Sequence, residues 1–233
     1  MKKLIAIALL LTMLAGVSAL AEEAVMSHAD FDAAELDSEV IVETYVQAKQ
    51  SWWSDKATIY TQAEDGAYFI YEMPISQEEY DKLIPGTKIK VKGYKSAWSG
   101  EVEITDATYE ILEADPFIPE AADVTALLAK EEELIAHQNE LVAFKGMTVE
   151  AYDETGAAFA YKNPTDKTDD LYFKLSKDGA TYDFCVEFYL CGQDTEVYKA
   201  VEALKVGDVI DLEGFLYWYN GANPHIISVK AAE

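Results

Sequence analysis

The side chains best suited to binding a ligand are aromatic residues in two groups. Trp52 and Trp53 lie together between two predicted strands, and Trp98 lies at a turn further along the chain. The second group is the run Tyr217, Trp218 and Tyr219. Exposed aromatic rings stack on sugar faces, nucleobases or apolar peptide side chains, while their N–H and O–H groups form hydrogen bonds. We predict that these six residues bind a ligand. The alternative is that they plug barrel ends or pack between domains.

Patterns for catalysis and metal binding are weak. The chain lacks the Gly-x-Ser-x-Gly, His-Glu-x-x-His, P-loop and Gly-x-Gly-x-x-Gly motifs. Asp166, Asp169 and Asp170 could offer oxygen ligands to Ca²⁺, but their spacing is not that of an EF-hand loop. A pair of glycosidase carboxylates would leave no sequence signal. We predict a protein that is not an enzyme, with no catalytic residue, no metal site and no cofactor.

The charge of the chain disfavours polyanionic partners. The 233 residues include 18 basic side chains, all of them Lys, and 43 acidic ones, which gives a formal net charge of -25. Such a protein repels phosphate backbones and anionic lipid surfaces. Without Arg it has no forked donor for phosphate or guanine. Lys88, Lys90 and Lys92, with Lys95 beyond them, form the one candidate stripe for oligonucleotide binding, and their simpler interpretation is a solvent-facing strand edge.

The N-terminus carries the features of an export signal. Lys2 and Lys3 precede an apolar run over residues 4–14, and small residues end at Ala21. This order is typical of a secretory signal peptide that is cleaved near Ala21. We therefore predict a secreted, extracellular or cell-envelope protein. The alternative is a membrane anchor that is retained.

Two cysteines, Cys185 and Cys191, flank a predicted strand. Six extended steps separate their Cα atoms by about 20 Å, which is too far for a disulfide. Export would permit a disulfide, yet we predict two unpaired and mostly buried thiols.

The two halves of the chain resemble each other. Gly86, Gly93 and Gly100 match Gly207, Gly214 and Gly221 with a constant offset of 121 residues. Further upstream, residues 65–67 match 178–180, and residues 45–48 match 148–151, with smaller offsets. The growing offset indicates insertions in the loops of the second copy, where insertions are tolerated.

Each copy has the same predicted order of elements: three strands, one helix and two more strands. In the first copy the strands cover 40–46, 57–61, 68–71, 88–94 and 102–111, and the helix covers 76–83 with Ser76 as its cap. In the second copy the strands cover 141–149, 170–175, 182–189, 209–218 and 224–229, and the helix covers 195–204. This order is that of the OB-fold, a five-stranded Greek-key barrel.

The segments Pro85–Tyr94 and Lys205–Phe215 resemble the fourth-strand signature of bacterial OB-fold domains. The whole chain resembles tandem OB-fold proteins secreted by Gram-positive anaerobic bacteria. The resemblance implies a mainly β protein with short helices and two tandem barrels, and it implies no activity. The domains that we predict are a signal peptide at 1–21, an N-terminal segment with a short helix at 22–36, an OB domain at 37–115, a linker helix at 116–138 and a second OB domain at 139–233.

Together these patterns predict an exported binding module whose aromatic loops contact a glycan or a peptide or protein surface. Ligands of OB barrels lie on the face of strands two and three, bordered by the loops that carry the Trp residues. Nucleic acid is disfavoured, and no membrane span is expected in the mature chain. The alternative function is a structural or assembly protein whose aromatic rings are buried between the barrels.

Overall fold

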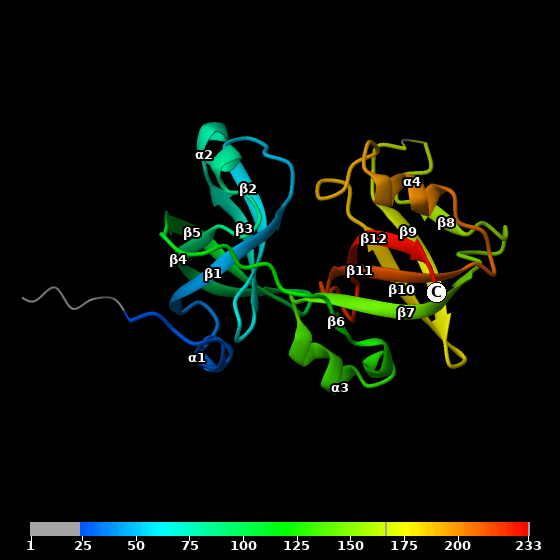
Figure 1. Ribbon diagram of the computed structural model, residues 1–233, viewed down its shortest axis with the longest axis horizontal. Coiled ribbons are helices and arrows are strands. Elements are labelled where there is room, and N and C mark those ends of the chain that lie inside the picture. Colours follow the sequence, from blue (N-terminus) through cyan, green and yellow to red (C-terminus); the bar gives the residue numbers. More distant parts are fainter. Residues whose placement is uncertain (1–23, 166, 233) are drawn as a thin grey trace, which may run out of the picture.

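The computed structural model describes residues 24–165 and 167–232. The predicted signal peptide at 1–21 lies outside the described residues. Two β-barrels stand side by side, and a short helical segment passes below and between them (Figure 1). Among the described residues no helix has both the length and the apolar character that crossing a membrane requires.

The first barrel is a closed sheet with the strand order β1-β2-β3-β5-β4. Its parallel pair is β3 with β5, and β4 returns antiparallel onto β1. Its elements are α1 (His28–Ala33), β1 (Glu39–Lys49), β2 (Lys56–Gln62), β3 (Ala67–Pro74), α2 (Gln77–Lys82), β4 (Lys88–Trp98) and β5 (Glu101–Ile111). The predicted capping box at the start of α2 is present, because Ser76 and Glu79 bond to each other's backbone N–H groups.

The second barrel repeats this topology with additions. Its sheet runs β6-β7-β11-β12-β10-β9-β8, and pairing of β7 with β9 closes a five-strand barrel. Here β10 pairs in parallel with β12, as β3 does with β5. Its elements are β6 (Ala122–Asp123), β7 (Leu141–Glu150), β8 (Phe159–Tyr161), β9 (Leu171–Lys177), β10 (Ala180–Val186), α4 (Glu196–Glu202), β11 (Val209–Phe215) and β12 (His225–Ala231).

The fold is therefore mainly β, with two tandem barrels of the OB type, as the sequence predicts. The insertion expected between the first two strands of the second copy contains β8. The predicted linker helix differs, because the structure has three short pieces there: η1 (Thr125–Leu127), α3 (Glu131–Leu134) and η2 (Ile135–His137).

Matched glycines occupy equivalent places in the two barrels. Gly86 and Gly207 precede the fourth strand of their copies with φ of 87° and 93°, in the left-handed region that favours glycine. Gly93 and Gly214 lie at register shifts in the fourth strands. A Cβ at either position would approach backbone of the fifth strand, within 2.7 Å or 2.4 Å of a carbonyl oxygen. Close strand approach therefore requires glycine in both copies.

Each barrel encloses its own apolar core. In the first, Val42, Ile59 and Ile70 are among the fully buried side chains, and in the second Phe144, Phe173 and Phe184 are. Cys185 and Cys191 are both buried and unpaired, which agrees with the prediction for the thiols.

Candidate ligand-binding cleft between the barrels

An aromatic cluster joins the two barrels. Tyr60 of β2 and Phe69 of β3 pack against Phe215 of β11, and all three are buried. The rings of Tyr60 and Phe215 are stacked, with centroids 4.6 Å apart and an angle of 26°. The Tyr60 hydroxyl forms a 2.6 Å hydrogen bond with Nδ1 of His225 in β12. The second barrel therefore covers part of the β2–β3 face, the face that OB folds use for ligands.

Hydrogen bonds fix how the barrels are oriented beside this cluster. The backbone N–H of Trp218 donates to Glu101 Oε2 at 2.8 Å, and that of Asn220 donates to the Ser99 carbonyl at 2.6 Å. The Ser51 N–H donates to the Tyr189 carbonyl at 2.7 Å. Because hydrogen bonds require a defined distance and angle, the first two hold the turn after β4 against the turn after β11, and the third holds the loop after β1 against the turn after β10.

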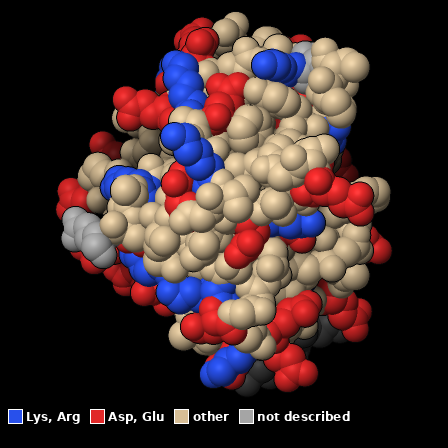
Figure 2. Space-filling model, turned by 90° about the vertical axis from the view of Figure 1, so that its right-hand side faces the viewer, with Lys and Arg blue, Asp and Glu red and all other residues tan. Residues whose placement is uncertain are grey.

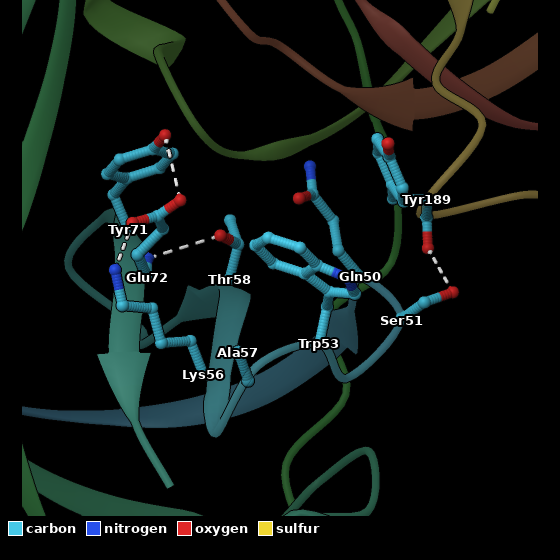
Figure 3. Close-up of a pocket in the computed structure, with 9 residues that line it drawn as sticks. All are labelled: Gln50, Ser51, Trp53, Lys56, Ala57, Thr58, Tyr71, Glu72 and Tyr189. Atoms are coloured by element: carbon cyan, nitrogen blue, oxygen red, sulfur yellow. Dashed lines mark hydrogen bonds and ion pairs between the residues drawn. The ribbon is translucent and has the colours of Figure 1, made fainter. Parts of the chain in front are cut away.

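Two adjoining hollows lie beside the joint, and we call them together the inter-barrel cleft. The smaller hollow, of about 330 Å³, is lined by residues 50–51, 53, 56–58 and 71–72 of the first barrel and by Tyr189 of the second (Figure 3). The larger, of about 430 Å³, lies between β3 and Trp98 on one side and β9, β10 and β12 on the other. Gln50 and Tyr71 line both hollows. Cavities of this size hold small-molecule ligands in many proteins.

Equivalent strands of the two copies face each other across the larger hollow. Phe69 and Tyr71 come from β3, while Tyr172 and Cys185 come from β9 and β10. Strands β2 and β3 of the first copy correspond to β9 and β10 of the second. The cleft is thus formed where the customary ligand faces of two OB barrels meet.

Exposed aromatic rings surround the cleft. Trp53 is 72% exposed, Trp98 is 61% exposed and Tyr219 is 51% exposed. Tyr71 and Tyr189 are also exposed. In Figure 3, Trp53 and Tyr71 project from the first barrel and Tyr189 from the second. These rings offer faces on which a planar ligand can stack.

Of the six predicted ligand-binding residues, four line the cleft and two do not. Trp53, Trp98, Tyr217 and Tyr219 line the cleft. The Trp52 indole instead packs on the core of the first barrel and donates its N–H to the Ile75 carbonyl at 2.9 Å. Trp52 therefore does not face the cleft beside Trp53 and Trp98.

Trp218 is a second correction. Its side chain is only 4% exposed, because it packs in the core of the second barrel and against Gly100 of the first. A ligand in the cleft cannot reach this ring. Its neighbour Tyr217 is half-buried, stacks on His225 with centroids 4.2 Å apart, and lines the larger hollow.

Several residues of the cleft were not predicted. The sequence could have predicted Tyr71, because the two-residue period of β3 places it on the same outward face as Phe69. Tyr172 follows from the same period in β9, once that strand is matched to the first copy. Tyr189 gave no signal, since it follows the end of β10 in a turn.

Carboxylates line the cleft on the side of the second barrel. Glu187 accepts hydrogen bonds from the backbone N–H groups of Tyr189 (3.1 Å) and Leu190 (2.6 Å). Burial raises the pKa of Glu187 to about 7, against the effect of these bonds. Asp170, also buried, accepts from Lys162 Nζ at 3.0 Å. Burial holds the pKa of His225 low, at about 3, so its ring is neutral.

The lysines of β4 do not form a basic stripe. Lys88 and Lys92 are paired with Glu43 (2.7 Å) and Glu39 (3.3 Å) of the adjacent strand β1. Lys95 is buried and donates to the carbonyls of residues 31, 32 and 34, at the end of α1. On the face of the molecule in Figure 2, lysines likewise lie among acidic side chains. Three of the four candidate phosphate contacts, Lys88, Lys92 and Lys95, are thus engaged within the protein.

The calcium hypothesis gains no support from the described part of the chain. Asp166 is outside it, and among the described residues no three His, Cys, Asp or Glu side chains are grouped so that they could hold a metal ion. Asp169 Oδ1 instead accepts the backbone N–H of Asp170 at 2.9 Å.

Comparisons with known proteins return solved structures alone, since no family model and no curated protein sequence matches this chain. One similar structure is a murine DNA-binding protein bound with double-stranded DNA, with 14% identity over 83% of this chain and 96% of that chain and a TM-score of 0.37. Another is the Ifi202 HINa domain in complex with a 20-bp double-stranded DNA, with 13% identity, coverage of 84% and 100%, and a TM-score of 0.34. A third is p202 HIN1 in complex with a 12-mer double-stranded DNA, with 14% identity, coverage of 85% and 94%, and a TM-score of 0.35.

These comparisons correct two predictions about partners. The three neighbours are bound with double-stranded DNA, whereas the sequence predicted a glycan or a peptide or protein ligand and disfavoured nucleic acid. We therefore drop the prediction of a glycan or peptide ligand, and nucleic acid is the ligand class to be tested by experiment. At identities of 14% or less and TM-scores of 0.37 or less, the likeness itself carries no ligand over to this chain.

Proposed function

We propose that this protein is a binding module that holds planar ring ligands, nucleobases first among them, by stacking in the inter-barrel cleft. The observation that carries the proposal is the set of exposed rings around the two hollows, with Trp53 and Trp98 as the largest. Stacking of a base on an aromatic side chain contributes about 1–3 kcal/mol and tolerates any base, because every base has a ring face.

The electrostatics of the cleft favour the base over the phosphate. Glu72, Asp170 and Glu187 line the hollows, and the lysines there, Lys56 and Lys162, are paired with Glu72 (2.6 Å) and Asp170 (3.0 Å). A phosphate chain that enters the cleft is therefore repelled. Salt screens such repulsion, so a single strand bound through its bases should bind more tightly as salt rises. Counterion release gives the opposite dependence when phosphates are the main contacts.

The test is a fluorescence titration of the intrinsic Trp residues at low and high salt. The ligands are single nucleosides, a single-stranded DNA of about eight nucleotides and a DNA duplex of about twelve base pairs. Nucleosides should bind with little salt dependence, and the single strand should bind more tightly at high salt. Duplex binding that weakens steeply with salt, without nucleoside binding, would refute the stacking proposal.

Variants locate the binding. Trp53→Ala and Trp98→Ala should each weaken nucleoside binding about fivefold or more, since each removes a stacking face. Tyr94→Ala is the matched control, because Tyr94 is exposed on β4 but lines neither hollow. Equal losses in all three variants would point to a general change in the protein and not to the cleft.

We further propose that binding occurs without catalysis and outside the cell. Support for the first part is that the cleft carboxylates are engaged with backbone N–H groups and lysine. The second part rests on the Lys2–Ala21 pattern and on the resemblance to proteins secreted by Gram-positive anaerobes. N-terminal sequencing of secreted protein should give a start at or near Glu22.

A further inference from the structure

Each hollow of the inter-barrel cleft has an exposed aromatic ring from each barrel. Trp53 of the first barrel and Tyr189 of the second line the smaller hollow (Figure 3). Trp98 of the first barrel and Tyr219 of the second line the larger hollow. All four side chains are more than half exposed, so their rings are open to a ligand. The cleft therefore contains the same arrangement twice.

Backbone hydrogen bonds hold the ring pair of the smaller hollow in place. The Ser51 N–H donates to the Tyr189 carbonyl at 2.7 Å, and the Ser51 hydroxyl donates to the same oxygen at 3.1 Å. Trp53 follows Ser51 closely in the chain, and its own N–H and carbonyl bond to the backbone of Lys56 at 3.2 Å and 3.1 Å. Because both segments are fixed by hydrogen bonds, the Trp53 and Tyr189 rings start from defined positions at this hollow.

The ring pair of the larger hollow is held in the same way. The Asn220 N–H donates to the Ser99 carbonyl at 2.6 Å. Asn220 directly follows Tyr219, and Ser99 directly follows Trp98, so this bond between the barrels lies next to both rings. A planar ligand that enters either hollow therefore meets aromatic faces from both barrels.

Tyr71 lies at the boundary of the two hollows, since it lines both of them. Its ring stacks on Phe69, with centroids 6.4 Å apart and an angle of 27°, and its hydroxyl donates to Glu72 Oε1 at 3.3 Å. Gln50 also lines both hollows. The hollows therefore adjoin at these side chains, and a single molecule can extend from one hollow to the other past Tyr71 and Gln50.

We infer, on the basis of the proposed stacking function, that the cleft takes a ligand with two planar rings on a short linker, one ring in each hollow. A dinucleotide has this form, because sugars and one phosphate join its two bases. The hollows, of about 330 Å³ and about 430 Å³, are each large enough for a small-molecule ligand. The linker passes Tyr71 and Gln50, and each base stacks on the rings of its own hollow.

The second ring should raise the affinity well above that of a ligand with one ring. Once one base is bound, the linker confines the other base near its hollow at an effective concentration of the order of millimolar. Its stacking then adds to binding without a second loss of translational freedom. We expect a DNA dinucleotide with two adenine bases to bind at least about tenfold more tightly than an abasic analogue, in which one of the two bases is absent.

The experiment is isothermal titration calorimetry of the full mature protein at high salt with the dinucleotide and its abasic analogue. Both ligands carry one phosphodiester, so repulsion from the carboxylates of the cleft affects them equally. Trp53→Ala and Trp98→Ala should each bring the ratio of the two affinities close to one, because each variant leaves one complete ring pair. Single nucleosides should lose affinity in each variant only at the hollow that is changed. Tyr94→Ala, which alters neither hollow, should keep the ratio of the wild type.

The outcomes separate this inference from the proposed function. Equal affinities of the two ligands for the wild type would overturn the inference and leave the stacking function standing. A failure of the dinucleotide and of adenosine to bind would overturn both. A ratio that persists in Trp53→Ala or in Trp98→Ala would show that the second base lies outside the assigned hollow, which also overturns the inference. Because the wild-type comparison needs no variant, it decides the question even where a variant does not fold.

Discussion

Replacing Glu101 by Gln should stabilise the protein above neutral pH. Glu101 is fully buried at the joint between the barrels. Its Oε2 accepts hydrogen bonds from the Trp218 N–H (2.8 Å) and from Gln138 Nε2 (3.2 Å). Its Oε1 and the Oδ1 of Asn139 are both buried without a partner in the described part of the chain. Burial, the largest cause, raises the pKa of Glu101 from 4.5 to about 8, although the hydrogen bonds from Trp218 and Gln138 lower it.

Because the pKa of Glu101 is raised by folding, the protein should lose stability as the pH rises. The pKa is higher in the folded than in the unfolded protein, so the stability associated with the protonated group is complete below about pH 4.5 and is lost as the pH rises through about 8. Between about pH 4.5 and about pH 8 the free energy of unfolding of the wild type falls by about 1.4 kcal/mol for each pH unit, which is about 4–5 kcal/mol in all. Gln does not titrate, and its amide supplies an N–H where the carboxylic acid supplies an O–H.

The assay is urea unfolding followed by Trp fluorescence at about pH 5 and about pH 9. Glu101→Gln should match the wild type at the lower pH and exceed it by about 3–5 kcal/mol at the higher pH. Exposed Glu132 on α3 offers the control, because Glu132→Gln removes a carboxylate from solvent and should leave the profile unchanged. A constant difference between Glu101→Gln and the wild type across this range would refute the assignment of a proton to Glu101.

Three further predictions concern the buried Lys95, the matched glycines and the two buried thiols. Lys95→Met leaves three carbonyls at the end of α1 without their buried donor, and thermal denaturation should show a loss of about 2–4 kcal/mol. Gly93→Ala and Gly214→Ala should each lower the free energy of unfolding by about 2–4 kcal/mol, because the new Cβ meets backbone of the fifth strand. A variant as stable as the wild type would contradict the equivalence of the two copies. Cys185 and Cys191 are buried, and burial raises the pKa of both thiols, so a thiol reagent should label them slowly in the folded protein and both rapidly in urea.

Local patterns predicted the barrels well because the signals lie within single elements. The capping box of Ser76 and Glu79, the alternation in β4 and the matched glycines depend on neighbours a few residues away. The glycine positions also carry long-range information, since Gly93 and Gly214 mark where two strands come too close for a side chain. A duplication repeats such marks, which is why the offset revealed two barrels.

The cleft was harder to predict because it depends on how the two barrels dock. Trp53 and Trp218 look alike in the sequence, yet one is exposed and the other is in the core. Their difference arises from packing of the turn after β11 on Gly100, which no local pattern encodes. The pairing of Lys88 with Glu43 likewise depends on the β1–β4 register, so a row of lysines that suggested a basic stripe is neutralised by the strand beside it.

The asymmetry of the duplication explains why a cleft exists at all. Two identical barrels that met face to face through their ligand strands would bury both faces. Here the second copy presents β11 and β12 to Tyr60 and Phe69, so its own β9–β10 face is only partly engaged. The hydrogen bonds of Trp218 and Asn220 to the turn at Ser99–Glu101 then hold the barrels at this offset. The uncovered parts of the β2–β3 face and the β9–β10 face therefore lie next to each other. The carboxylates of the second barrel lie opposite the exposed aromatic rings of the first.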